Sequence, residues 1–240
     1  MNGLFKPEEP PRAPAIGSAM FEGFCRMFFS CYCSLTVEGR QHLPSGPFLL
    51  CSNHTSHADS AALMTASGRS FRELALLGAS DYFFETRRVH WVVSPLMNVI
   101  PIERKPGAHS LSESLERCRR FLEQTGGGLI LYPEGTRSLD GEMQEFKSGA
   151  GLFCSELGVP LVPAYVEGTH RVLPKGQSVP RPGHVTVRFG QPLAANALPG
   201  SREGIRNWRR SVVEQLSENI RLLSLADRDQ ELVAGSREKG

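Results

Sequence analysis

A histidine and an aspartate stand close together in the segment CSNHTSHAD, residues 51–59. His54 and Asp59 are five residues apart, and on a regular helix of about 3.6 residues per turn this spacing places them on different faces. They pair only if the chain turns between them, with His54 on a loop and Asp59 in the first turn of a helix. A carboxylate bound to one imidazole nitrogen leaves the other nitrogen able to take a proton from a hydroxyl. The pattern therefore predicts general-base chemistry.

The same segment has two other interpretations. Its hydroxyl and carboxylate side chains are of the types that cap helices, which would make the neighbouring histidines incidental. The segment also contains four potential metal ligands: Cys51, His54, His57 and Asp59. The usual ligand spacings are missing, and no second Cys/His cluster accompanies them. We therefore predict no metal site.

Two further motifs have simpler explanations than catalysis. Ser56 and Ser60 are nucleophiles by residue type, but no Gly-x-Ser-x-Gly turn surrounds either of them. The three glycines at 126–128 lack the Gly-Lys-Ser/Thr of a phosphate loop and precede a predicted strand rather than a helix. Glycines of this kind are typical of a helix end.

Cations follow two predicted strands. Arg104 and Lys105 end the segment VIPIERK, and Arg137 lies near the end of YPEGTRS. A guanidinium offers a planar fork of donors that suits a phosphate. The ordinary alternative is a surface salt bridge, for which Glu103 and Glu134 are available partners.

The turn beside Arg137 has the composition of a ligand-binding loop. Gly135 allows the backbone to approach a ligand closely, and Thr136 supplies a hydroxyl. Three cations and a candidate base, all placed after strands, together predict a phosphate site.

Such a site needs a scaffold that brings strand ends together. Strands are predicted over residues 35–38, 48–52, 74–77, 98–102, 129–132, 161–166 and 185–189. Helices are predicted over residues 60–66, 111–122, 148–157 and 201–223, the last capped by Ser201. This alternation predicts one α/β domain with a mainly parallel mixed sheet flanked by helices. Ligands bind such sheets at the carboxyl ends of the strands.

An amphipathic helix is predicted to precede the domain. Large apolar side chains recur with helical spacing between residues 16 and 35, and a narrow polar stripe accompanies them: Ser18, Glu22, Arg26 and Ser30. Apolar surface over most of the circumference is typical of a helix packed on a core or of one lying in a membrane interface. The residues alone leave both interpretations open.

Composition excludes several classes of protein. Among 240 residues, 27 Lys and Arg oppose 25 Asp and Glu, and this balance of +2 argues against a nucleic-acid-binding protein. No apolar run reaches the ~18 residues of a spanning helix, and the N-terminus lacks the apolar stretch of a signal peptide. The six cysteines do not have the regular spacing of a disulfide framework and are expected to be reduced.

The predicted organisation is a flexible leader (1–14), the amphipathic helix (15–34), the α/β domain (35–224) and a charged tail (225–240).

Four blocks follow one another in order: NHTSHAD at 53–59, VIPIER at 99–104, YPEGTRS at 132–138 and VPLVPAYVEG at 159–168. In order, spacing and strand context they resemble the blocks of the glycerophospholipid acyltransferase family, in particular those of the bacterial 1-acyl-glycerol-3-phosphate acyltransferases. The resemblance covers about residues 35 to 190, which is most of the domain.

The resemblance implies direct transfer of an acyl group from acyl-CoA or acyl-carrier protein to the free hydroxyl of 1-acyl-glycerol-3-phosphate, giving phosphatidic acid with no acyl-enzyme and no further cofactor. His54 would be the general base, and Asp59 would orient it. Arg104 and Arg137 would hold the acceptor phosphate, and Glu134, Gly135 and Thr136 would shape the turn of this phosphate-binding site. Lys105, which lies just outside the family block, would assist them. Pro163 would lie on the acyl-donor side, although an edge or bulged position in a strand explains this proline equally well. His57 occupies a variable place in its block and is predicted to be non-catalytic.

A lipid substrate favours the membrane interface for the N-terminal helix, because no spanning helix brings the enzyme to its substrate. We therefore expect a cytoplasmic protein, peripheral on the inner face of the cell membrane. Four arginines of the last helix either add attraction to anionic lipid or form a solvated face: Arg202, Arg206, Arg209 and Arg210.

Three other functions stay open at this point. The same mechanism could act on another lysophospholipid or on an amino-acid- or sugar-based lipid. A catalytically silent lipid-binding protein would have the same fold, but the intact pair of His54 and Asp59 argues against it. A metal-dependent hydrolase would require bound metal.

Overall fold

The computed structural model describes residues 15–79, 96–103, 107–174, 176–177, 179–193 and 198–237. For residue 108 and residues 227–237 only the backbone is described. The predicted leader, residues 1–14, lies outside these ranges.

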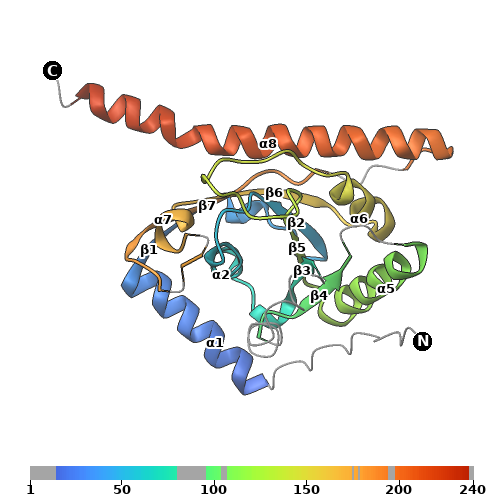
Figure 1. Ribbon diagram of the computed structural model, residues 1–240, viewed down its shortest axis with the longest axis horizontal. Helices are drawn as coiled ribbons and strands as arrows, with labels where there is room; N and C mark the ends of the chain where they lie inside the picture. The colour runs from blue at the N-terminus through green and yellow to red at the C-terminus, as the bar shows by residue number, and fades with distance from the viewer. Residues whose placement is uncertain are drawn as a thin grey trace.

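Within the described ranges, seven strands form one sheet in the spatial order β1-β7-β6-β2-β5-β3-β4 (Figure 1). The strands are β1 (Cys33–Glu38), β2 (Phe48–Ser52), β3 (Leu74–Ala79), β4 (Val99–Ile102), β5 (Gly128–Leu131), β6 (Leu161–Glu167) and β7 (Gly183–Phe189). Neighbouring strands run parallel, apart from the antiparallel pair of β6 and β7. The predicted mainly parallel mixed sheet is confirmed.

Helices cover both faces of this sheet (Figure 1). The α-helices are α1 (Ala15–Met27), α2 (Ala58–Ser67), α5 (Ala108–Thr125), α6 (Gly149–Leu157), α7 (Thr169–Val172) and α8 (Arg202–Arg237). Shorter turns are the π-helical η1 (Phe28–Tyr32) and the 3-10 helices η2 (Arg40–His42) and η3 (Phe71–Glu73). One core layer joins the sheet to α1, α2 and α7, and the other joins it to α5, α6 and α8.

Strand β2 lies in the middle of the sheet and takes part in both core layers. Its side chains alternate, so that Phe48 and Leu50 belong to one layer while Leu49 and Cys51 belong to the other. All four are fully buried. Burying each large apolar side chain contributes about 1.5–3 kcal/mol, which makes β2 a firm support for the loop that follows it.

The N-terminal helix and the last helix end at other residues than predicted. The N-terminal helix ends at Tyr32, because Cys33 already pairs with Gly183 at the start of β1. The last helix begins as predicted, with the Gly204 N–H donating to the hydroxyl of Ser201, but it continues to Arg237 where a charged tail was expected. Residues 224–234 contain no glycine or proline to end a helix.

Helix α1 turns its polar stripe toward the domain. Ser18 is buried, and the carboxylate of Glu22 accepts hydrogen bonds from the backbone N–H of Phe71 and the hydroxyl of Ser70. Arg26 pairs with Glu22.

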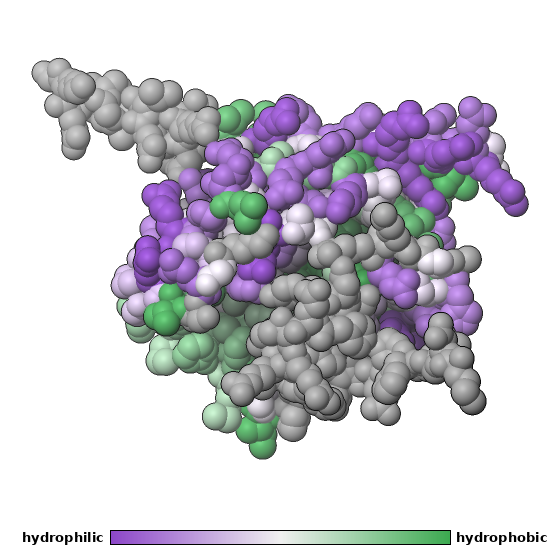
Figure 2. All heavy atoms as spheres, viewed as in Figure 1, coloured by the Kyte–Doolittle hydropathy of each residue, from purple (hydrophilic) through white to green (hydrophobic). Residues whose placement is uncertain are grey.

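The apolar side chains of α1 face outward instead. Ile16, Met20, Phe24 and Met27 are each more than half exposed. Figure 2 shows the resulting hydrophobic surface at the lower left, over α1. Because Cys25 and Phe29 are nevertheless buried in the core, the helix both packs on the domain and presents an apolar face.

Helix α8 is arranged in the usual way. Three of its apolar residues are buried in the core layer that α8 shares with β6 and α6: Val212, Leu216 and Ile220. The guanidinium of Arg209 donates to Ser155 and Glu156 on α6, so this arginine has a structural partner. Helix α8 covers the face of the sheet opposite α1, and its arginines are therefore separated from the apolar face of α1 by the sheet (Figure 1).

None of the helices among the described residues has both the length and the apolar character to cross a bilayer. The six cysteines are unpaired, and Cys31 is exposed while the others are buried.

Candidate active site

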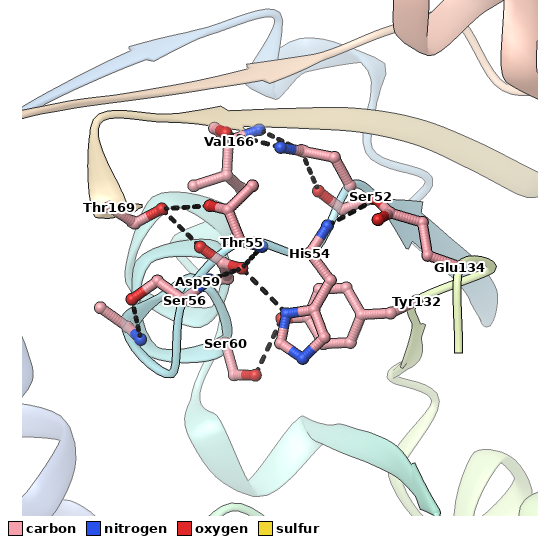
Figure 3. Close-up of polar contacts among 12 residues, drawn as sticks. Ser52, His54, Thr55, Ser56, Asp59, Ser60, Tyr132, Glu134, Val166 and Thr169 are labelled. Carbon is pink, nitrogen blue, oxygen red and sulfur yellow. Dashed lines mark hydrogen bonds and ion pairs between the residues drawn. The ribbon is translucent and has the colours of Figure 1, made fainter. Parts of the chain in front are cut away.

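The loop after β2 lies at the carboxyl end of the central strand, between the ends of β6 and β5. His54 belongs to this loop, and Asp59 lies in the first turn of α2. The chain turns between them, as the spacing required, and His54 Nδ1 is 2.9 Å from Asp59 Oδ2 (Figure 3). An ionised carboxylate only accepts hydrogen bonds, so Nδ1 carries the hydrogen and Nε2 keeps its lone pair. This is the arrangement that a general base requires.

Asp59 is fully buried and surrounded by donors. Its Oδ2 accepts the backbone N–H groups of Thr55 and Ser56 at 2.7 and 2.9 Å, and its Oδ1 accepts the hydroxyl of Thr169 at 2.5 Å. A buried charge is tolerated only with such partners, and the N-terminus of α2 adds a favourable dipole. Ser56 also caps the helix, because its hydroxyl accepts the Ala58 N–H. Capping and the histidine–aspartate pair therefore coexist in one turn.

Asn53 anchors the start of the loop to β6. Its side chain donates to the carbonyl of Val166 at 2.9 Å and accepts the Val166 N–H at 2.8 Å. Because Asn53 is buried and uses both ends of its amide, the residue before His54 has a single position.

The loop after β5 forms hydrogen bonds with the backbone of His54. The His54 N–H donates to Glu134 Oε1 at 2.8 Å, and the Ser138 N–H donates to the His54 carbonyl at 2.8 Å. Burial raises the pKa of Glu134 to about 7, although the N–H groups of His54 and Gln144 partly offset that rise. Within the described residues the second oxygen, Oε2, has no hydrogen-bond partner.

Tyr132 supports the imidazole from its face. The two rings are stacked with centroids 3.8 Å apart and an interplanar angle of 10°. The phenol exchanges a 2.8 Å hydrogen bond with Ser60 of α2, which holds the tyrosine ring in place. An aromatic face attracts a cation that lies above it. The stack with Tyr132 therefore stabilises the imidazolium that forms when His54 takes a proton. The side chain of His54 is 19% exposed, which leaves its outer edge accessible.

The predicted phosphate-binding turn lies directly beside this pair. Gly135 has a φ of +72°, a left-handed conformation that favours glycine. Arg137 is half-buried, and it acts electrostatically on His57, whose pKa falls to about 4 through desolvation first and the charge of Arg137 second. Thr136 is exposed. Arg104 and Lys105 lie outside the described residues.

Lys147 is a further cation at this turn. A Cβ on residue 135 would lie 2.7 Å from the Lys147 ammonium, so the lysine side chain passes directly over Gly135. The backbone N–H of Lys147 donates to the Pro133 carbonyl, which ties the lysine to the same turn. The candidate phosphate site therefore has a positive charge that was not predicted.

Pro163 lies away from these side chains, in the middle of β6 and paired with Cys51 of β2. Since β6 lies between β7 and β2, an edge position is excluded. The bulged position is compatible with the pairing, because residues 161 and 164 of β6 pair with residues 193 and 189, which leaves one extra residue on the opposite segment. The Pro163 carbonyl accepts the N–H of Gly190, just beyond the end of β7. The proline nitrogen, which has no hydrogen, points to the same side, where the ladder with β7 has ended.

Among the described residues, no group of three or more His, Cys, Asp or Glu side chains is arranged to hold a metal ion.

Three residues contribute to the site without having been predicted from the sequence: Tyr132, Lys147 and Thr169. Tyr132 belongs to a block that was recognised, but nothing local shows which ring it stacks on. Lys147 follows the turn by ten residues, and Thr169 is 110 residues from Asp59. Only the order of the strands brings them to the site.

Comparison with known proteins identifies the family. The family model described as Acyltransferase matches residues 34–167. The chloroplastic 1-acyl-sn-glycerol-3-phosphate acyltransferase of Arabidopsis thaliana is 33% identical over 162 residues, which are 66% of this chain and 43% of that protein. The alpha enzyme of the same name from Homo sapiens is 28% identical over 196 residues, covering 77% of this chain and 65% of that protein.

A solved structure has the same fold. The crystal structure of the 1-acyl-sn-glycerophosphate acyltransferase from Thermotoga maritima superposes with a TM-score of 0.60 at 25% identity, covering 84% of this chain and 78% of that one. This chain spans less than half the length of the relatives from Arabidopsis thaliana, Brassica napus and Chlamydomonas reinhardtii. The family model covers more than half of the chain, from β1 to the end of β6. The chain therefore belongs to the Acyltransferase family, that of the glycerophospholipid acyltransferases.

Proposed function

We propose that this protein transfers a fatty acyl group from an acyl thioester to the free hydroxyl of 1-acyl-glycerol-3-phosphate, giving phosphatidic acid. The observation that carries the proposal is the pair of His54 and Asp59 at 2.9 Å beside a turn that bears Arg137. The names of the relatives in plants, Homo sapiens and Thermotoga maritima support the choice of acceptor.

In the proposed reaction, Nε2 of His54 takes the proton of the acceptor hydroxyl as its oxygen attacks the thioester carbonyl. The C–S bond then breaks, and the proton passes from the imidazolium to the leaving thiolate. Asp59 stays ionised throughout and balances the charge of the imidazolium. General-base catalysis of this kind contributes about 10²–10⁴-fold to the rate.

The phosphate of the acceptor would lie on the turn after β5. Arg137 supplies a planar fork of donors, and Lys147 adds a positive charge above Gly135. The conformation of Gly135, with no side chain, allows the backbone to approach the phosphate. We assign Arg104 and Lys105 to the same phosphate from the family resemblance.

The donor would be acyl-CoA or acyl-carrier protein, and the reaction needs no other cofactor. Pro163 is assigned to the donor side by the family resemblance alone. Its place within β6 suggests that it acts by shaping the sheet beneath the site.

We further propose that the enzyme meets its substrate from the membrane surface through α1. The exposed side chains of Ile16, Met20, Phe24 and Met27 form an apolar face of the kind that enters the acyl region of a bilayer. Since the acyl donors are intracellular, this surface would be the cytoplasmic, inner face of the cell membrane.

The test is an assay of the purified chain with a panel of acceptors and donors, with product identification by mass spectrometry. Phosphatidic acid from 1-acyl-glycerol-3-phosphate and acyl-CoA or acyl-carrier protein is the expected product. Faster acylation of another lysophospholipid, or of an amino-acid- or sugar-based lipid, would keep the mechanism and change the acceptor. Absence of thiol release from every donor and acceptor pair would leave a lipid-binding protein.

A further inference from the structure

We propose that Thr169 is a positioning residue for the catalytic pair, acting through Asp59. Its hydroxyl holds the carboxylate oxygen that faces away from His54, and it thereby sets the plane and the charge of the carboxylate. The inference deepens the proposed function and rests on it.

The direction of the hydrogen bonds follows from the number of protons. Thr169 Oγ1 is 2.5 Å from Asp59 Oδ1 and 3.3 Å from the hydroxyl of Thr55. A carboxylate only accepts, so the single proton of Thr169 points to Asp59. The Thr55 hydroxyl must then donate to Thr169. The two hydroxyls form a chain whose dipoles both point toward the carboxylate, and each bond in such a chain strengthens the next.

Thr169 uses its hydroxyl across the fold and not within its own helix. It is the first residue of α7 and follows the N-cap, Gly168, and α7 has no side-chain cap. The side chain is fully buried instead and reaches from the end of β6 to α2 (Figure 3). A residue that served only to begin α7 would not need this contact.

The contact matters because the two oxygens of Asp59 have different partners. Oδ2 accepts His54 and two backbone N–H groups, while among the described residues Oδ1 accepts only Thr169. Without the hydroxyl, Oδ1 would be a buried anionic oxygen with no partner, so the carboxylate would rotate or take up a proton. In either case His54 would lose the charge that stabilises its imidazolium.

Three variants separate this role from packing. Thr169→Val keeps the shape and removes the hydroxyl, Thr169→Ser keeps the hydroxyl, and Thr65→Val is the matched control. Thr65 is also buried, on α2, and its hydroxyl has no hydrogen-bond partner within the described residues.

The first readout is steady-state kinetics. We expect Thr169→Val to lower kcat roughly tenfold to a hundredfold, the usual effect of losing a hydrogen bond to a charged group, with the acceptor KM unchanged. Thr169→Ser and Thr65→Val should stay within twofold of the wild type. A kcat within twofold for Thr169→Val would overturn the proposal, as would a loss of kcat in Thr169→Ser equal to that in Thr169→Val.

The second readout does not depend on acyl transfer. The hydrogen between His54 Nδ1 and Asp59 should give a low-field proton NMR resonance, assigned by its absence in His54→Gln. This resonance should persist in Thr169→Ser and shift or disappear in Thr169→Val, or in Thr169→Ala if the valine variant does not fold. An unchanged resonance in the hydroxyl-free variant would contradict the proposal even if the wild type acylates a different acceptor. A wild type without acyl transfer would refute the proposed function alone.

Discussion

Two regions of the molecule depart from the usual distribution of polar groups outside and apolar groups inside. The surroundings of Asp59 place polar groups in the interior, and the outer face of α1 places apolar groups on the surface. Around Asp59 a carboxylate and several hydroxyls are fully buried, whereas along α1 large apolar side chains are more than half exposed. Each Asp59 oxygen has a donor, whereas the α1 face stays largely exposed even though the ring of Phe24 lies 6.3 Å from that of Phe28. The buried carboxylate therefore finds its partners within the chain, while an exposed apolar face of this kind is typical of an interaction site.

This difference separates the two tasks that the proposed function requires, catalysis and access to a bilayer. Chemistry needs groups held in one geometry, which the hydrogen bonds from β6, α2 and the turn after β5 provide. Access to a bilayer needs surface that water disfavours. Substitutions in the first region should therefore change turnover, and substitutions in the second should change membrane binding.

The largest effect is expected at His54. His54→Ala removes the base and should lower kcat by about 10²–10⁴-fold. The side chain is only partly buried and makes a single hydrogen bond, to Asp59, so the fold should persist. A turnover assay measures the loss of activity, and thermal unfolding of the same preparation measures whether the fold persists. Turnover close to that of the wild type would remove His54 from the mechanism.

Arg137, at the rim of the polar cluster, should act on acceptor binding. Arg137→Ala is expected to raise the acceptor KM roughly tenfold to a hundredfold, since a charge-assisted hydrogen bond contributes about 1.5–3 kcal/mol. Arg210→Ala, an exposed arginine on α8, is the control and should leave KM unchanged. Equal KM values for wild type and Arg137→Ala would place the phosphate elsewhere.

The proposed membrane binding of the exposed apolar face is tested with a substitution on α1. Phe24→Ser should weaken sedimentation with phospholipid vesicles by about tenfold, because burying one large apolar side chain contributes about 1.5–3 kcal/mol. Thermal stability should not fall, because Phe24 is 56% exposed. Leu222→Ser on α8 is the matched control, since Leu222 is also 56% exposed but lies on the opposite side of the sheet. Vesicle binding lost equally in both variants would show that α1 is not the contact.

The smallest effect concerns the pH dependence of stability at Glu134. Burial raises the pKa of this carboxyl from 4.5 to about 7, so between these pH values the folded chain keeps a proton that the unfolded chain loses. Glu134 therefore stabilises the fold below pH 4.5 and loses that contribution as pH rises through about 7, by about 1.4 kcal/mol for each unit of pKa difference. Glu134→Gln cannot ionise, and its melting temperature relative to the wild type should rise by a few degrees from pH 5 to pH 8. A constant difference would show that Glu134 is not buried in its acidic form.

Much of the fold was predictable from local patterns. The strand predicted over residues 48–52 has the same bounds in the structure, because five consecutive buried residues between a proline and a polar loop leave little alternative. The pairing of His54 with Asp59 was also predictable, since it depends only on a strand, a loop and a helix that follow one another.

The orientation of α1 was not predictable, because helical periodicity shows which residues share a face and not which face meets the domain. The hydrogen bonds that Ser70 and Phe71 donate to the carboxylate of Glu22 fix the orientation of α1. Helix α7 was also missed, because four residues are too few for a period.

By itself, the sequence determined the positions of the elements, the types of the reacting groups and the family. Strand order alone decided which distant groups meet: β5 and β6 flank β2, so Tyr132 and Thr169 both reach the residues that follow β2. The physical reason is that periodicity and residue type are properties of short segments. A contact between residues 110 positions apart exists only after the sheet has assembled.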